Sequence, residues 1–205
     1  MGGSCSAARL FHLETRCTIV RAAREDRRRP GIEPARVAGR DTASGPAVPW
    51  WGMSRVEGGT ALVTGGASGI GRLTGRELLS RGAARLVVWD VDRAALAALR
   101  DELAGAGHEV VGMEVDLAEL DAIRRGMREL RARDIAVDLL VNNAGVVVGA
   151  DFQCHSHDDI SRTLAVNAAG PMHLTRELLP DMLARGAGHV VNIASAAGLV
   201  SNPRV

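Results

Sequence analysis

The chain reads Thr64-Gly65-Gly66-Ala67-Ser68-Gly69-Ile70-Gly71 directly after an apolar run at 61–63 and directly before a helix-like run at 72–80. A strand, a glycine turn and a helix in this order are typical of a phosphate-binding site. Glycines let the backbone approach a pyrophosphate closely, and the helix N-terminus supplies free N–H groups and a partial positive charge. The spacing is Gly-x-x-x-Gly-x-Gly, which differs from the common Gly-x-Gly-x-x-Gly fingerprint. By itself this stretch, called the glycine turn below, also fits a tight turn without a ligand.

Downstream of residue 58, apolar runs alternate with helical patterns. Predicted strands cover 60–64, 85–90, 109–115, 136–141 and 189–194, and predicted helices cover 69–81, 92–106, 117–133 and 157–185. Continuously apolar strands that alternate with helices indicate a parallel sheet covered on both faces. Right-handed crossovers favour the order 3-2-1-4-5 for the five strands, so the sequence predicts an α/β fold with a doubly wound, Rossmann-type sheet.

Residues 1–57 differ from the rest in composition. They contain the charged run REDRRR at 24–29 and four prolines between 30 and 49, with no sustained hydrophobic period. This composition predicts a disordered arm before one domain at 58–205. The arm has no apolar core of a secretory signal, and its acidic residues argue against a transit peptide. Alternatively, translation starts at Met53 and the preceding residues are an over-extended reading frame.

The overall composition narrows the function classes. The net charge of +1 gives no electrostatic case for binding nucleic acid or an anionic membrane. No apolar run approaches the ~20 residues that span a bilayer. Cys5, Cys17 and Cys154 have no paired or metal-ligand spacing, so we expect free thiols in a reducing, cytoplasmic compartment. The run HSHDD at 155–159 fits the polar start of a helix better than a metal site.

Polar residues follow the predicted strands where ligands of such sheets bind. Asp90 lies 19 residues after Gly71 (90 − 71 = 19) and can accept hydrogen bonds from the adenosine ribose, which favours NAD over NADP. Its alternative is a helix N-cap, for which Asp92 is better placed, and Arg93 could in principle meet a 2′-phosphate. Asp116, followed by Leu117, either flanks the adenine or caps the next helix.

These stretches together carry a family resemblance. In addition to the motifs above, the chain has Asn142-Asn143-Ala144-Gly145, a helical Asn167 and the run VVNIAS at 190–195, all in one order from about Gly59 onward. The chain resembles the short-chain dehydrogenase/reductase family. Within that family, the stretches 87–90, 140–147 and 194–201 are similar to a subgroup that acts on retinoid, steroid or related lipid alcohols.

The resemblance implies a role for each matching residue. Gly65, Ser68, Gly69, Ile70 and Gly71 would contact the phosphates and the neighbouring sugar; Asp90 the adenosine ribose; Asp116 and Leu117 the adenine; and Asn143, Ala144 and Gly145 the nucleoside region. Asn167 would hold a water in a proton relay. Ser195 would orient the oxygen of a small-molecule alcohol or ketone substrate during hydride transfer to or from the nicotinamide.

In the family, a tyrosine thirteen residues after the serine exchanges the substrate proton, with a nearby lysine that favours the phenolate. From Ser195 this tyrosine would fall at position 208, beyond Val205, and the 205 residues contain no tyrosine or lysine. We therefore expect a fold incomplete at its C-terminus and a chain that is inactive alone. The last strand would have an open edge. Full-length relatives are expected to be homo-oligomers.

Two other functions compete with the dehydrogenase. A non-catalytic NAD-binding module or sensor would bind NAD without turnover. A sugar-nucleotide epimerase is disfavoured, because that group tends to have a Gly-x-x-Gly-x-x-Gly loop, which differs from the spacing of Gly65, Gly69 and Gly71.

Overall fold

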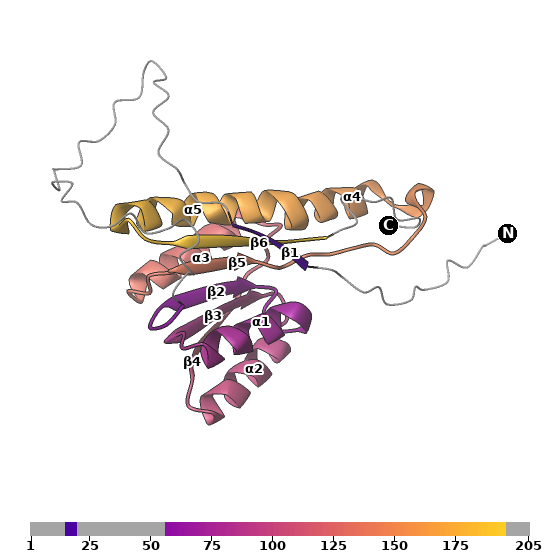
Figure 1. The fold of residues 1–205 in the computed structure, drawn as a ribbon. Helices are drawn as coiled ribbons and strands as arrows, with labels where there is room; N and C mark the ends of the chain where they lie inside the picture. The colour runs from indigo at the N-terminus through magenta and orange to yellow at the C-terminus, as the bar shows by residue number, and fades with distance from the viewer. Residues whose placement is uncertain (1–14, 20–55, 196–205) are drawn as a thin grey trace, which may run out of the picture.

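The computed structural model describes residues 15–19 and 56–195, and it contains a six-stranded sheet in the order β1-β6-β5-β2-β3-β4 (Figure 1). The strands are β1 (Thr15–Ile19), β2 (Thr60–Thr64), β3 (Arg85–Asp90), β4 (Glu109–Glu114), β5 (Leu139–Asn142) and β6 (His189–Ser195). Strands β2 to β6 pair in parallel. Their order is the predicted 3-2-1-4-5, so the doubly wound α/β fold is confirmed.

Helices cover both faces of the sheet (Figure 1). They are α1 (Gly69–Ser80), α2 (Arg93–Gly105), α3 (Leu120–Ala132), α4 (His157–Leu164) and α5 (Gly170–Arg185), with a short helical turn at Phe152–Cys154. Alternate residues of β2 point to opposite faces, as strand geometry requires. Ala61 and Val63 lie in a core with α1 and α2, whereas Leu62 lies in a core with α3 and α5.

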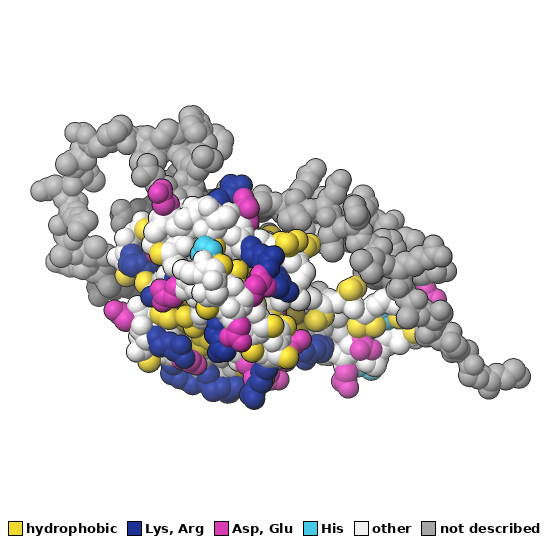
Figure 2. Space-filling view, turned by 90° about the horizontal axis from the view of Figure 1, so that it is seen from below, with side chains coloured by type: hydrophobic (Ala, Val, Ile, Leu, Met, Phe, Trp, Pro, Cys, Tyr) yellow, Lys and Arg dark blue, Asp and Glu magenta, His cyan; other side chains and the backbone are white. Residues whose placement is uncertain are grey.

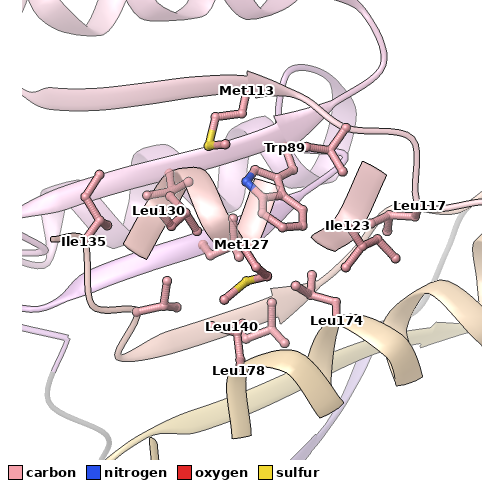
Figure 3. Packing of buried hydrophobic residues seen from close by; sticks show 14 of the residues in the cluster. Trp89, Met113, Leu117, Ile123, Met127, Leu130, Ile135, Leu140, Leu174 and Leu178 are labelled. Carbon is pink, nitrogen blue, oxygen red and sulfur yellow. The ribbon is translucent and has the colours of Figure 1, made fainter. Parts of the chain in front are cut away.

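The core beneath α3 and α5 is built around Trp89, the largest fully buried side chain in the part of the chain that the structure describes (Figure 3). Trp89 packs in one cluster with Met113, Ile123 and Met127. Gly126 of α3 permits this packing, because a Cβ atom there would lie 2.7 Å from Cζ2 of Trp89. Trp89 is the residue before Asp90, so this packing fixes the end of β3 at the edge where ligands bind in such sheets.

Two predicted starts differ from the structure by three residues, and one predicted helix contains an irregular turn. Helix α3 begins at Leu120 rather than 117, because residues 116–119 form a turn in which the N–H of Glu119 donates to the carbonyl of Asp116 (3.1 Å). Strand β5 begins at Leu139 rather than 136. The predicted helix at 157–185 is continuous but contains a π-helical turn at Ala165–Ala169 between α4 and α5.

Strand β1 was not predicted. It pairs antiparallel with β6, with Thr15 opposite Ser195 and Ile19 opposite Val191. The last strand, β6, was expected to have an open edge. This expectation is wrong, because the backbone groups on that edge of β6 are paired with β1. The segment TRCTI is rich in β-branched residues, the one signal that favours a strand. The rest of 1–55, including Met53, lies outside the described residues, as does 196–205.

Charges of both signs are interspersed on the side of the molecule that carries α1 and α2 (Figure 2). Arg72 and Arg76 of α1 both pair with Glu102 of α2, which joins the two helices over the sheet. Among the described residues, no helix combines the length and the apolar character needed to cross a membrane.

Candidate functional site

A cavity of about 440 Å³ opens where β2, β3, β4 and β5 end. Its lining includes ten of the eleven residues predicted to contact a dinucleotide: Gly65, Ser68, Gly69, Ile70, Asp90, Asp116, Leu117, Asn143, Ala144 and Gly145. These residues come from four separate segments of the chain. The structure thus brings the predicted nucleotide residues together at the carboxyl edge of the sheet.

The glycine turn is shaped to admit a ligand in front of α1. Gly69 has a φ of +51°, and a Cβ atom added there would meet nothing within 4 Å, so the space beside it is open. Ser68 occupies the N-cap of α1 but makes no side-chain bond to the helix. The first turn of α1 therefore keeps N–H groups that an anion in the cavity can accept from.

Gly71, the eleventh predicted residue, lies behind the cavity wall instead of lining it. A Cβ atom at Gly71 would lie 2.3 Å from the carbonyl oxygen of Gly65 and 2.5 Å from Nδ2 of Asn143. Glycine at this position lets α1 approach the glycine turn and the end of β5 closely. Its contribution is the packing that sets the shape of the cavity.

Thr64 joins the ends of β2 and β5, a role that was not predicted from the sequence. Its side chain is fully buried, and the hydroxyl accepts hydrogen bonds from the N–H groups of Asn143 and Ala144, both at 3.0 Å. In turn, Nδ2 of Asn143 donates hydrogen bonds to the carbonyls of Thr64 (2.9 Å) and Gly65 (3.2 Å). The glycine turn and the turn after β5 thus form one hydrogen-bonded unit. The only signal in the sequence is a threonine at the end of an apolar strand.

Asp90 links β3 to the glycine turn. Its Oδ2 accepts from the N–H of Ala67 (3.0 Å), while Oδ1 accepts from the N–H groups of Val91 (2.8 Å) and Asp92 (3.2 Å). Asp92, not Asp90, caps α2 through a bond from Ala95 (2.9 Å), so the N-cap alternative for Asp90 is wrong. Asp90 thus borders the cavity with a carboxylate that neighbouring backbone groups hold in place.

The charged side chains near Asp90 bear on whether the site favours a ribose hydroxyl or a 2′-phosphate. Arg93, the candidate for a 2′-phosphate, pairs with Glu114 at the end of the adjacent strand β4. Its guanidinium is therefore already in contact with a carboxylate. Among the residues that line the cavity, the acidic ones are Asp90 and Asp116.

Asp116 is held by a turn and by a residue from α4. Its Oδ1 accepts from the N–H of Ala118 (2.9 Å), and its Oδ2 lies 3.4 Å from both terminal nitrogens of Arg162. The N-cap of α3 is Glu119, so the alternative that Asp116 caps this helix is wrong. Arg162 was not predicted, because nothing in the local pattern of α4 shows that this side chain reaches the turn after β4.

Asn167 and Ser195 lie outside the cavity. Asn167 is in the π-helical turn, where its Oδ1 accepts from the N–H of Val146 and its Nδ2 donates to the carbonyl of Val146, both at 2.8 Å. Such turns occur frequently at functional sites. Ser195 is the last residue of β6 and is exposed.

Asn167 borders a second depression of about 970 Å³, called the asparagine groove below, along α5 and β6. Asn142 is buried at its base, and its Nδ2 donates to Oδ1 of Asn192 (2.8 Å) and to Oγ1 of Thr175 (3.3 Å). This polar cluster ties β5, β6 and α5 together beside the nucleotide residues.

The predicted polar helix start at 155–159 is the beginning of α4. Ser156 and Asp159 form a capping box: the N–H of Asp159 donates to Oγ of Ser156 (3.1 Å), and the N–H of Ser156 donates to Oδ2 of Asp159 (2.9 Å). The hydrogen bonds from the hydroxyl and the N–H of Ser156 hold the pKa of Asp159 below its usual range. This box fixes the start of the helix that carries Arg162 and Asn167.

We expect Asp159→Ala to lower the melting temperature at neutral pH by more than Asp158→Ala does. Both changes remove a charge from the first turn of α4, but only the first removes the capping box. Because the pKa of Asp159 is lowered in the folded chain, its contribution is present above the unfolded pKa and is lost as pH falls through the folded value. Thermal unfolding from pH 7 to pH 3 tests this, and a gap between the variants that persists at the acid end would contradict it.

Comparison with known proteins gives a consistent answer. The family model described as short chain dehydrogenase matches residues 59–205. The human estradiol 17-beta-dehydrogenase 11 is 36% identical over 148 residues, which cover 72% of this chain and 49% of that protein. The mouse 17-beta-hydroxysteroid dehydrogenase 13 is 34% identical over 143 residues, or 70% of this chain and 47% of the relative. The chain thus spans about half the length of the curated relatives it matches.

Solved structures agree with the sequence relatives. A short-chain dehydrogenase/reductase from Burkholderia phymatum in complex with NAD is 38% identical, with a TM-score of 0.69 over 75% of this chain and 54% of the other. A metagenomic short-chain oxidoreductase in complex with NADP is 37% identical, with a TM-score of 0.66 over 73% of this chain and 67% of the other.

Proposed function

The chain belongs to the short-chain dehydrogenase family, and from that premise we propose that residues 58–205 bind the nicotinamide dinucleotide of an oxidoreductase. The observation that carries the proposal is the convergence of the predicted residues on one cavity at the carboxyl edge of the sheet. The bound cofactor would accept a hydride from an alcohol or return it to a ketone.

The residues present fit such a cofactor. The open space beside Gly69 and the N-terminus of α1 would receive the pyrophosphate. Asp90 would accept hydrogen bonds from the ribose hydroxyls, Asp116 and Leu117 would contact the adenine, and residues 143–145 would contact the nucleoside. Ser195 would orient the substrate oxygen, and Asn167 would position a water for proton transfer.

We also propose that the chain prefers NAD to NADP. The carboxylate of Asp90 would repel a 2′-phosphate, and Arg93 is already paired with Glu114. Solved relatives are complexed with either cofactor, so the preference rests on these side chains.

The proposed substrate is a lipid-like alcohol or ketone. The sequence stretches at 140–147 and 194–201 support it, as do the relatives named for estradiol and hydroxysteroids. A cytoplasmic location and a homo-oligomeric assembly stay predictions.

Titration of the 205-residue chain with NAD and NADP tests both parts of the proposal. Binding is the readout, because the sequence contains no tyrosine, the residue to which the resemblance assigns proton transfer. We expect NAD to bind at least about tenfold more tightly, a difference of about 1.4 kcal/mol. Asp90→Asn should reduce that ratio to about one, because it removes the charge but keeps an oxygen for the N–H of Ala67.

The matched control is Asp101→Asn on α2, which removes an exposed carboxylate paired with Arg100, away from the cavity. It should leave both affinities unchanged. Equal or tighter binding of NADP by the unmutated chain contradicts the NAD preference. Failure of the folded chain to bind either dinucleotide contradicts the proposed function.

A further inference from the structure

The lining of the cavity carries charges of both signs. Among its lining residues, the ionisable side chains are Asp90, Asp116 and Arg162. A nicotinamide dinucleotide brings two negative charges on its pyrophosphate, so two carboxylates in the same cavity oppose its entrance unless one is neutralised. Arg162 is the one basic side chain in this lining, and it lies against Asp116.

The ion pair between Arg162 and Asp116 leaves part of the Asp116 carboxylate available to a ligand. Oδ1 is occupied by the N–H of Ala118, and the two terminal nitrogens of Arg162 lie 3.4 Å from Oδ2. A carboxylate oxygen can accept more than one hydrogen bond. The side chains of Asp116 and Arg162 are 32% and 54% exposed, so the pair is open to the cavity.

The position of Arg162 is also fixed by the hydrogen bonds at the start of its own helix, α4. The capping box of Ser156 and Asp159 begins α4, and Thr163 donates back to the carbonyl of Asp159 (2.7 Å). Val166, one turn further on, is buried and lines the same cavity. Residues about one turn apart lie on the same side of a helix, in agreement with the position of both Arg162 and Val166 in the lining of the cavity.

We propose that Arg162 is a positioning residue that gives the site its selectivity for adenine. It holds the Asp116 carboxylate with Oδ2 toward the cavity and offsets its charge, so that this oxygen accepts a hydrogen bond from the 6-amino group of the base. This inference rests on the proposed function, in which Asp116 contacts the adenine.

The test compares NAD with nicotinamide hypoxanthine dinucleotide, which has the same charge but a carbonyl in place of the 6-amino group. The unmutated chain should bind NAD about tenfold more tightly, because the 6-oxo oxygen of the analogue is an acceptor that would face Oδ2 of Asp116 where NAD presents a donor. In Arg162→Gln the ratio should fall to about two, with most of the loss in NAD affinity. Arg162→Lys, which keeps the charge but not the two-nitrogen fork, should give a ratio between these values.

The ratio of the two affinities separates a role of Arg162 in positioning Asp116 from a general attraction for the pyrophosphate. If Arg162 only attracts the pyrophosphate, Arg162→Gln weakens both dinucleotides equally and the ratio is unchanged, which overturns the proposal. Unchanged affinities for both ligands overturn it as well. The matched control Arg176→Gln removes an exposed arginine that borders the asparagine groove, and it should leave the ratio unaltered.

The two proposals fail in distinguishable ways. If the unmutated chain unfolds cooperatively but binds neither dinucleotide, the proposed function fails and this inference fails with it. If the chain binds NAD and the base ratio does not respond to Arg162, only the inference fails. Thermal unfolding without ligand checks that Arg162→Gln is folded, which the exposure of this side chain leads us to expect.

Discussion

Replacing Gly71 by alanine is expected to weaken NAD binding by about a hundredfold, or about 2.7 kcal/mol. The new methyl group would lie 2.3 Å from the carbonyl oxygen of Gly65 and 2.5 Å from Nδ2 of Asn143, so α1 must move away from the glycine turn. One of these obstacles is backbone and the other is held by two hydrogen bonds, so neither can give way easily. The shift would separate the N-terminus of α1 from the position of the pyrophosphate.

The free energy of unfolding of Gly71→Ala should also fall, by about 1–3 kcal/mol, as is typical of overpacking. Gly105→Ala is the matched control: Gly105 ends α2, and a Cβ atom there meets nothing within 4 Å. It should leave NAD affinity unchanged. Isothermal titration and urea unfolding measure both quantities, and near-native NAD affinity in Gly71→Ala would show that α1 and the turn do not depend on this close approach.

Replacing Thr64 by valine is expected to lower the free energy of unfolding by about 2–4 kcal/mol. Valine has nearly the same shape but removes the hydroxyl that accepts from the N–H groups of Asn143 and Ala144. Two backbone donors would then lose their acceptor beside a fully buried side chain, and each unsatisfied donor costs about 1–3 kcal/mol. NAD affinity should fall too, because residues 143–145 line the cavity.

Thr64→Ser is the matched control, because it removes a methyl group but keeps the hydroxyl. It should lose less stability than Thr64→Val, even though valine retains more apolar volume. Urea unfolding of the three chains gives the comparison. A valine variant as stable as the serine variant would mean that the two N–H groups find other partners, and that the hydroxyl does not join β2 to β5.

The sequence predicts the centre of the parallel sheet well, because burial on both faces requires a continuous apolar run in each central strand. Strands β2 and β3 are almost wholly buried, and their apolar runs end where the structure ends them. Boundaries were less accurate where backbone hydrogen bonds, not hydrophobicity, decide them. The turn after Asp116 delays α3, and nothing in the apolar pattern records that turn.

The residues of the candidate site were predictable from the sequence, but the hydrogen bonds and ion pairs between them were not. Glycine spacing, the acids at strand ends and the family resemblance together identify ten residues around the cavity. The contacts that hold them span large sequence separations, such as Thr64 with Asn143 and Asp116 with Arg162. A local pattern does not contain such pairings. Strand β1 was missed for a related reason, since its partner β6 lies at the other end of the chain.

The π-helical turn at Ala165–Ala169 has a consequence for how this gene can change. A π-turn holds one residue more than an α-helical turn, and each helical residue advances by roughly 100° around the axis. Loss of a single codon here would convert the π-turn into an α-helical turn. Because either turn completes about one rotation, Arg162 would keep nearly the same phase relative to the anchored face of α5 at Leu174 and Leu178. A one-residue gap placed here when family members are aligned therefore marks the loss or gain of the π-turn, while the faces of the flanking helices stay in phase.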